Sequence, residues 1–237
     1  MFQKVSRLLP SVLLFMFMAA FAASATNTVF NHIEDMSGWD SCTGCAGGGG
    51  KAVYSMHQHQ ASPSVDGSSM VISLGGTKPF SHALYWRRIS SNGTASNFVL
   101  DMYYYIDKPA NSQGLEFAAN QSVSNYWYKF STQCAFSSGE WRVWDSKNSK
   151  WVSTGISCNR PQANTWQHVV FEYSRSGGHA NFLSITVNGN KHYVNRSFSP
   201  LKQKTSDSVG IHFQLDGDAS QNDYKVWTDC MTLTYWY

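Results

Sequence analysis

The sequence predicts an all-β protein, a single antiparallel β-sandwich of the jelly-roll kind. After the first 25 residues, apolar and polar side chains alternate with a period of two, and no long segment has the 3.6-residue period of an amphipathic helix. Short turn sequences separate the alternating runs at close and regular spacing. Many short strands joined in this way are typical of antiparallel sheets packed as a sandwich or jelly roll.

The expected strands are the alternating runs in chain order: 52–56, 69–74, 82–87, 97–106, 115–120, 126–133, 140–145, 151–153, 167–175, 182–187, 191–198, 209–215 and 225–235. The turn signals between them are Asp66-Gly67, Gly75-Gly76, Asn92-Gly93, Asn188-Gly189 and Asp216-Gly217. The chain has no internal repeat and no proline-rich linker, and residues 47–50 are a glycine run expected to form a loop. We therefore expect residues 26–237 to form one domain.

Residues 1–25 have the features of a secretory signal peptide. Lys4 and Arg7 make a basic start, an apolar run follows, and Ala23-Ser24-Ala25 makes a small-x-small end. We expect cleavage after Ala25 and a secreted protein, extracellular or periplasmic, with no membrane span after cleavage. The alternative is an uncleaved membrane anchor, but the apolar run is short for a span and lacks a basic flank on its far side.

The charge balance argues against a nucleic-acid partner. Beyond residue 25, 16 lysines and arginines face 15 acidic residues, so there is no basic excess to neutralise phosphates. Aromatic residues make up 15% of the chain, slightly more than the 14% that are charged. This composition suits a secreted protein that meets uncharged or weakly charged ligands through stacking and neutral hydrogen bonds.

Five cysteines are compatible with disulfides in an exported protein. Cys134 and Cys158 flank a turn-rich segment and are expected to form a bridge. Cys42 and Cys45 form a C-x-x-C pair, for which a local disulfide is favoured over zinc or redox chemistry, because there is no second pair and no βαβ setting. Cys230 remains as a free thiol or as half of a bridge to a partner.

The segment from Trp166 to Gly189 reads W-x-H-V-V, a gap, and then L-x-I-x-V-N-G. Val169 and Phe171 fall on one face of the expected strand, and Asn188-Gly189 suits a tight hairpin turn. This segment resembles the hairpin of laminin-G-like and concanavalin A-like sandwiches, which implies a jelly roll of the lectin and glucanase type. The superfamily includes lectins, glycosidases, lyases and adhesion modules, so the resemblance implies architecture and not activity. His168 is expected to be a structural hydrogen-bonding residue.

The two ends of the domain resemble carbohydrate-binding modules. Residues 33–39 (IEDMSGW) and 226–236 (VWTDCMTLTYW) are similar to the first and last strands of such jelly rolls. The resemblance implies a structural calcium ion held by Glu34 and Asp229, with no other cofactor required. A second acidic set, in the sequence DGDASQND, is rich in oxygen ligands, but ordinary turn chemistry explains it equally well; its acids are Asp216, Asp218 and Asp223.

The catalytic patterns of related sandwiches are mostly missing. Hydrolases on this fold commonly carry paired acids in an E-x-D-x-E strand, and none of the four glutamates lies in such a run. Alginate-lyase sandwiches are expected to show a Gln-x-His strand, and here His212 and Gln214 stand in the reverse order. We therefore assign no catalytic residue; an enzyme would draw on Glu116, His212 and Gln214.

Polar and aromatic side chains at alternating strand positions predict a binding groove. If their strands share one concave sheet, they line a groove in which rings stack on sugars and polar groups bind hydroxyls. The alternative is a solvated outer face of satisfied polar pairs. The expected groove residues are Glu116, Tyr126, Tyr128, Gln133, Arg142, Trp144, His212 and Gln214.

Together these features predict a secreted carbohydrate-binding, lectin-like protein. One alternative is a polysaccharide lyase or glycoside hydrolase on the same sandwich. The other is an adhesion module that binds protein, which would carry a large exposed apolar patch in place of an aromatic groove. The sequence leaves the oligomeric state open.

Overall fold

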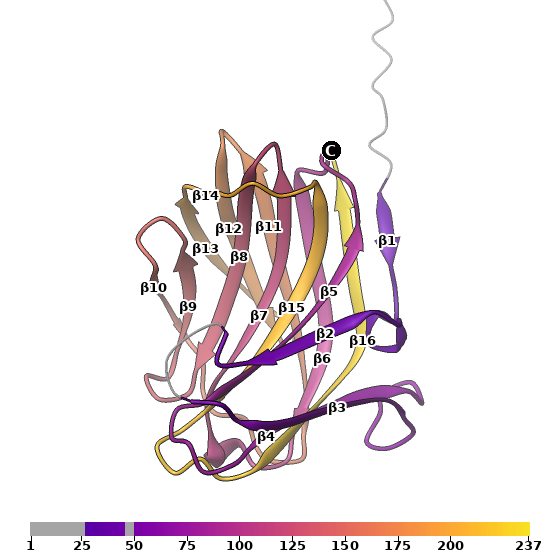
Figure 1. The fold of residues 1–237 in the computed structure, drawn as a ribbon, viewed down its shortest axis with the longest axis vertical. Helices are drawn as coiled ribbons and strands as arrows, with labels where there is room; N and C mark the ends of the chain where they lie inside the picture. The colour runs from indigo at the N-terminus through magenta and orange to yellow at the C-terminus, as the bar shows by residue number, and fades with distance from the viewer. Residues whose placement is uncertain (1–26, 46–49) are drawn as a thin grey trace, which may run out of the picture.

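A computed structural model describes residues 27–45 and 50–237, and it shows two antiparallel sheets packed face to face (Figure 1). The predicted all-β sandwich is confirmed. The expected signal peptide, residues 1–25, and most of the glycine run at 47–50 lie outside the described residues. None of the helices in the described part of the chain is long and apolar enough to cross a membrane.

The first sheet has the strand order β13-β12-β11-β6-β16-β4-β3, with β1 paired to β16. Its strands are β1 (Thr28–Phe30), β3 (Val53–Gln60), β4 (Ser69–Gly75), β6 (Asn97–Ile106), β11 (Trp166–Ser176), β12 (His179–Val187), β13 (Asn190–Phe198) and β16 (Tyr224–Trp236). The predicted hairpin of Asn188 and Gly189 is present between β12 and β13, and both residues have the positive φ angles, 48° and 83°, that a tight turn requires.

The second sheet has the order β10-β9-β8-β7-β15-β5-β2, with β14 paired to β8. Its strands are β2 (Trp39–Thr43), β5 (His82–Ser90), β7 (Ser112–Val123), β8 (Tyr126–Ala135), β9 (Glu140–Asp145), β10 (Lys150–Ser157), β14 (Leu201–Lys202) and β15 (Ser208–Gly217). In Figure 1 this sheet lies in front of the first. Its outer face carries Glu116, Gln133, Arg142 and Gln214.

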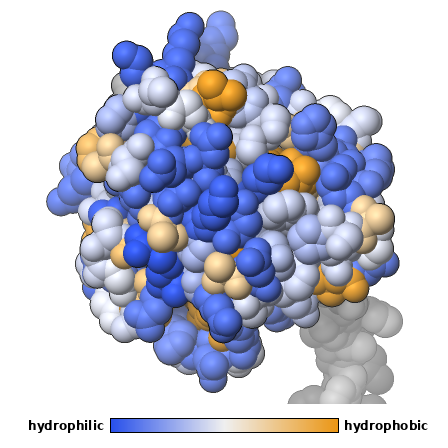
Figure 2. Space-filling view, turned by 90° about the horizontal axis from the view of Figure 1, so that it is seen from below, coloured by the Kyte–Doolittle hydropathy of each residue, from blue (hydrophilic) through white to orange (hydrophobic). Residues whose placement is uncertain are grey.

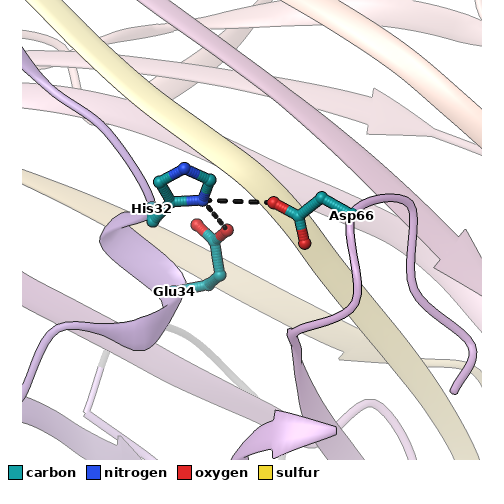
Figure 3. A group of neighbouring side chains, drawn as sticks. All are labelled: His32, Glu34 and Asp66. Carbon is teal, nitrogen blue, oxygen red and sulfur yellow. Dashed lines mark ion pairs between the residues drawn. The ribbon is translucent and has the colours of Figure 1, made fainter. Parts of the chain in front are cut away.

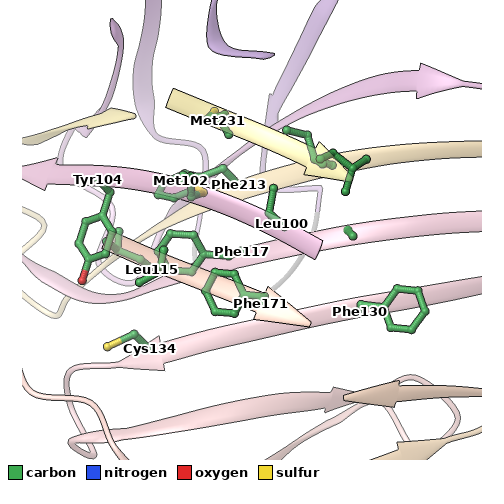
Figure 4. Close-up of a cluster of buried hydrophobic side chains, with 14 of the residues drawn as sticks. Leu100, Met102, Tyr104, Leu115, Phe117, Phe130, Cys134, Phe171, Phe213 and Met231 are labelled. Carbon is green, nitrogen blue, oxygen red and sulfur yellow. The ribbon is translucent and has the colours of Figure 1, made fainter. Parts of the chain in front are cut away.

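The core fills the space between the sheets with alternate residues of each strand. On β6, for example, Phe98, Leu100 and Met102 are almost completely buried while the residues between them are half-buried. Phe117 of β7 lies at the centre, with its ring centroid 4.9 Å from that of Phe213 and 5.2 Å from that of Phe171 (Figure 4). The period-two pattern therefore reports the inward face of each strand.

One expected element is wrong. Residues 33–39, which resemble the first strand of carbohydrate-binding modules, instead contain a 3-10 turn, η1 (Ile33–Asp35), and β2 begins only at Trp39. His32 has a left-handed backbone (φ 49°), which turns the chain out of an extended path. Hydrogen bonds from side chains, and not a backbone ladder between strands, hold this segment. Trp39 Nε1 donates to the Ile33 carbonyl at 3.1 Å, and Glu34 accepts from the Met231 amide. A second 3-10 turn, η2, spans Pro109–Asn111.

The cysteine pairing agrees with the prediction. Cys42 is bonded to Cys45, and Cys134 is bonded to Cys158. Cys230 is free and half-buried.

Candidate functional site

Four of the predicted groove residues form one row across the outer face of the second sheet. Gln214 of β15 is the register partner of Glu116 on β7, Glu116 is the partner of Gln133 on β8, and Gln133 is the partner of Arg142 on β9. Their neighbours along each strand point into the core, so these four side chains share the opposite face. His212 lies on the same face, two residues before Gln214.

Glu116 is the centre of a buried polar cluster. Its Oε1 atom lies 2.7 Å from His212 Nε2 and 3.5 Å from Lys129 Nζ. Asn120 Nδ2 donates to His212 Nδ1 at 2.9 Å. Because Nδ1 then accepts a hydrogen bond, a neutral imidazole carries its proton on Nε2 and donates it to Glu116. The cluster thus fixes one tautomer of His212.

At neutral pH this cluster contains the carboxylate of Glu116, the ammonium of Lys129 and the neutral imidazole of His212. Burial acts to raise the pKa of Glu116, but Lys129 and the hydrogen bond from His212 outweigh it, and the pKa falls to about 2. Burial lowers the pKa of His212 below its ordinary value, and this exceeds the opposing effect of Glu116. At neutral pH the ion pair is therefore Glu116 with Lys129, and His212 is uncharged.

A second buried network lies beside the first. Arg142 Nη2 donates to Gln133 Oε1 at 2.6 Å, and Gln133 Nε2 donates to Asp216 Oδ2 at 2.7 Å. Gln214 Nε2 donates to the other oxygen, Oδ1, at 2.8 Å. Burial, and then the negative charge of Glu116, raise the pKa of Asp216 to about 7. The amide side chains of Gln133 and Gln214 therefore serve this network and hold Asp216 in place.

A cleft of about 550 Å³ opens over this face. Three tryptophans line it: Trp86 of β5, Trp127 of β8 and Trp144 of β9. Lys129 also lines the cleft, with its ammonium 5.3 Å from the Trp144 ring centroid and 5.9 Å from that of Trp127. Both indoles thus lie within cation–π distance of one ammonium group. His212 and Asn120 are also part of the lining.

Two buried polar atoms at or beside the cleft have no hydrogen-bond partner. They are Asn120 Oδ1 and Arg87 Nε, and both residues are among those that line the cleft. A buried acceptor or donor without a partner is unfavourable by roughly 1–3 kcal/mol. Atoms of this kind, gathered at a cleft with aromatic walls, are what a ligand with hydroxyl or charged groups would satisfy.

Of the eight predicted groove residues, only Trp144 and His212 are part of the cleft lining. Glu116, Gln133, Arg142 and Gln214 form the polar networks of the same sheet face but do not line the cleft. The two tyrosines are placed elsewhere. Tyr128 belongs to the buried core and is only 6% exposed, with Arg175 over its ring at 5.7 Å, so the expectation that it lines the groove is wrong. Tyr126 begins β8 and is 41% exposed, but it is not part of the cleft lining. Both share a strand face with Phe130, a core residue, and this shared face could have excluded them.

The same alternation marks the residues that the sequence reasoning missed. Trp127 and Lys129 alternate with Tyr128 and Phe130, so they share a face with Gln133, which was assigned to the groove. Trp86 is the register partner of His212 across β5 and β15. No local signal marks Trp86, because its place in the cleft depends on the pairing of two strands far apart in the sequence.

His168 lies on the outer face of the other sheet. Its Nε2 atom is 2.7 Å from Asp101 Oδ1, and its ring stacks on Tyr103 with centroids 4.4 Å apart. It lies in the other sheet from the cleft strands. Its hydrogen bond to Asp101 and its stacking on Tyr103 are contacts of a structural residue.

A group of potential cation ligands lies where η1 meets β16. His32, Glu34 and Asp66 bring ligand atoms within 4.8 Å of one another (Figure 3). Asp66, Asp229 and Cys230 form an adjoining group that shares Asp66. The two acids that the resemblance implies for calcium, Glu34 and Asp229, are thus both present in this region.

The side chains differ in how they fit a cation. Glu34 is fully buried, its Oε1 has no hydrogen-bond partner, and burial raises its pKa to about 7. Asp229, in contrast, already accepts from Ser64 Oγ at 2.7 Å and from the amides of Val65 and Cys230 at 2.5 and 2.7 Å. A hard cation therefore fits Glu34 and Asp66 as oxygen ligands, and Asp229 anchors the β3–β4 loop that carries Asp66.

The second acidic set does not form a common site. Asp216 is engaged by the two glutamines of the buried network. Asp218 accepts from the amides of Ser220 and Gln221, as in an Asx turn, and Asp223 accepts from the Gly76 amide. The turn interpretation of this segment is the better one.

No protein-family model matches the chain, and no curated protein sequence matches it significantly. Solved structures share the fold. A carbohydrate esterase from the Shiga toxin-encoding bacteriophage phi24B aligns at a TM-score of 0.52 and 13% identity, over 90% of this chain and 99% of its own. The cellulose-induced protein Cip1 aligns at 0.52 and 11% identity, over 82% and 90%. A family 11 carbohydrate-binding module from Clostridium thermocellum aligns at 0.42 and 15% identity, over 90% and 96%. At these identities the two alignments with a TM-score of 0.52 establish the fold alone.

Proposed function

We propose that this protein binds carbohydrate in the cleft on the outer face of the second sheet. The observation that carries the proposal is the cleft itself, about 550 Å³ in volume, with Trp86, Trp127 and Trp144 around a buried polar cluster. Indole rings offer apolar faces to the C–H faces of sugars, and the side chains of Asn120 and His212 offer hydrogen bonds to hydroxyls. The fold shared with a carbohydrate esterase and with Cip1 supports this proposal at the level of architecture.

The chemistry of the cluster favours binding over hydrolysis. A glycoside hydrolase needs a carboxylic acid that can protonate the leaving group, together with a second free carboxylate. Glu116, with a pKa of about 2, is ionised and held by Lys129 and His212. Asp216 has the raised pKa of an acid, but both of its oxygens accept from glutamines and it is 6% exposed. Neither carboxyl group is free to act on a sugar in the cleft.

The surface does not favour the adhesion alternative. The end of the molecule seen in Figure 2 is mostly hydrophilic, with small and separate hydrophobic spots. Among the described residues, the large exposed hydrophobic side chains are scattered over different elements, for example Val29 on β1, Val53 on β3 and Leu183 on β12. Scattered residues of this kind are usual on any soluble surface.

A polysaccharide binding panel with matched tryptophan variants tests the proposal. We expect the protein to be retarded by at least one polymer in affinity electrophoresis, and Trp144→Ala to weaken that binding about tenfold, since a ring contact contributes roughly 0.5–1.5 kcal/mol beyond its buried area. Trp166→Ala removes an indole from the outer face of the opposite sheet and should leave binding unchanged.

Binding to no polymer in the panel would contradict the proposal, as would equal effects of the two variants. The same incubations are assayed for new reducing ends and for the absorbance of unsaturated uronates. Either product would replace the binding role with an enzymatic one in the same cleft.

A further inference from the structure

We infer that the ligand of this cleft is an anionic polysaccharide, one that carries carboxylate or sulfate groups along its chain. The inference rests on the proposed function and adds the charge of the ligand to it. The described residues that line the cleft include three basic ones, Arg87, Arg88 and Lys129, and no aspartate or glutamate. This is a marked bias in a protein whose basic and acidic residues are nearly balanced beyond residue 25.

One of these charges is already neutralised. Lys129 lies 3.5 Å from the buried Glu116 carboxylate, so its charge is compensated from beneath the cleft. Neither Arg87 nor Arg88 forms an ion pair with any acidic side chain in the described part of the protein. Only Arg88 is on the face of β5 that carries Trp86, because Arg87 alternates with them and shares the face of the buried Tyr85. One positive charge on the cleft face thus has no acidic partner.

Hydrogen bonds to backbone carbonyls position the two arginines without neutralising their charge. Arg88 Nη2 donates to the Asp207 backbone carbonyl at 2.8 Å, and Arg87 Nη1 donates to the Arg88 carbonyl at 2.9 Å. Carbonyl groups orient a guanidinium but leave its net charge intact. Arg87 Nε is buried and has no partner at all. A recessed site with uncompensated charge of one sign attracts ligands of the opposite sign.

The charge of Arg88 and the indole ring of Trp86 lie on the same face of β5. Trp86 and Arg88 are two residues apart on β5 (Figure 1), so they share one face at a separation of about 7 Å along the strand. Their partners on β15 are His212 and Gly210, both of which line the cleft. A sugar ring stacked on Trp86 would place a substituent within reach of Arg88. The forked donors of a guanidinium match the two oxygens of a carboxylate or sulfate.

The experiment measures the affinity of the intact protein for matched polymers at low and high salt. Polygalacturonate and alginate supply carboxylates, dextran sulfate supplies sulfates, and amylose and mixed-linkage β-glucan are neutral.

Two charge variants accompany the wild type. Arg88→Gln removes a cleft charge, and Arg196→Gln removes an exposed charge from β13 of the other sheet. We expect a uronate polymer to bind best, and Arg88→Gln to weaken it about tenfold, as for loss of a hydrogen bond to a charged group. Arg196→Gln should have no effect.

The outcomes separate this inference from the function on which it rests. Preference for dextran sulfate with the same dependence on Arg88 supports the inference with sulfate as the anion. Binding to neutral polymers alone overturns the inference and leaves carbohydrate binding intact. Binding to none overturns both. Equal losses for the two arginine variants, with all binding removed at high salt, would show ion exchange by the whole surface and would also overturn the inference.

Discussion

At the scale of single residues, Asp216 shows how burial changes the meaning of a motif. In the sequence it opens a loop rich in acidic residues and suggests a metal or a turn. In the structure it is 6% exposed, and two glutamine amides hold its carboxylate next to the negative charge of Glu116. Its raised pKa makes it a source of pH-dependent stability.

We predict that Asp216→Asn reduces the loss of stability between about pH 4 and pH 7. The pKa of Asp216 in the folded protein, about 7, lies above its ordinary value of 3.8. Between these values the folded state binds a proton that the unfolded state releases, so its contribution to stability falls as pH rises through this range. A shift of this size corresponds to at most about 4 kcal/mol.

Urea unfolding of both proteins at the two pH values measures the effect. The variant should gain stability relative to wild type at the higher pH. Asp218→Asn, which removes a half-exposed carboxylate of the same loop, should shift stability equally at both pH values. A constant difference between wild type and Asp216→Asn would show that Asp216 titrates normally.

At the scale of elements, the β9–β10 hairpin presents Arg142 and Trp144 to the site, and a disulfide closes the segment that contains it. Cys134 lies near the end of β8, and Cys158 directly follows β10. The bridge therefore ties both ends of the hairpin to the central strands. The other bridge, Cys42–Cys45, closes a far shorter loop beside the cleft.

We predict that loss of the two bridges has unequal effects. The sequence separations are 24 residues for Cys134–Cys158 and 3 for Cys42–Cys45. By loop-closure entropy, replacing both cysteines by alanine should lower the free energy of unfolding by about 3 kcal/mol for the long loop and about 1.5 kcal/mol for the short one. Equilibrium urea unfolding under non-reducing conditions measures both. An equal or reversed order would mean that native-state contacts, and not the unfolded chain, set the effect.

At the scale of the whole molecule, the cation-ligand group connects segments that are far apart in the chain. Glu34 lies on η1, Asp66 on the β3–β4 loop, and the Met231 amide that binds Glu34 on the last strand. We propose that a structural calcium ion joins these segments through Glu34 and Asp66. It would neutralise a buried carboxylate that has one oxygen without a hydrogen-bond partner, 3.7 Å from His32 Nδ1.

We predict that millimolar calcium raises the melting temperature of metal-stripped protein and that a chelator reverses the rise. Differential scanning calorimetry measures both. Glu34→Gln should abolish the response to calcium while it stabilises the metal-free protein, because a neutral amide removes a buried charge.

Glu172→Gln, at an exposed ion pair with Lys191, is the control and should keep the calcium response. No shift with calcium in the wild type would contradict the proposal, and a shift with zinc alone would assign the site to His32 and Cys230.

Alternation and turn chemistry in the sequence determined the sandwich, nearly all of its long strands, the Asn188-Gly189 hairpin and both disulfides. These follow from local rules, since a strand with one buried face must alternate and a tight turn needs residues that tolerate positive φ. Alternation also grouped Glu116, Gln133, Arg142 and Gln214 correctly, because each lies opposite core residues on its own strand.

Only the tertiary structure decided which face of each strand is buried and which strands are neighbours. That choice moved Tyr128 into the core, and it brought Trp86 beside His212 across 126 residues of sequence. It also placed Lys129 against Glu116 and left Arg88 at the cleft without an acidic partner. The reason is physical: side-chain direction has a period of two that the sequence records, but the pairing of distant strands depends on packing over the whole core.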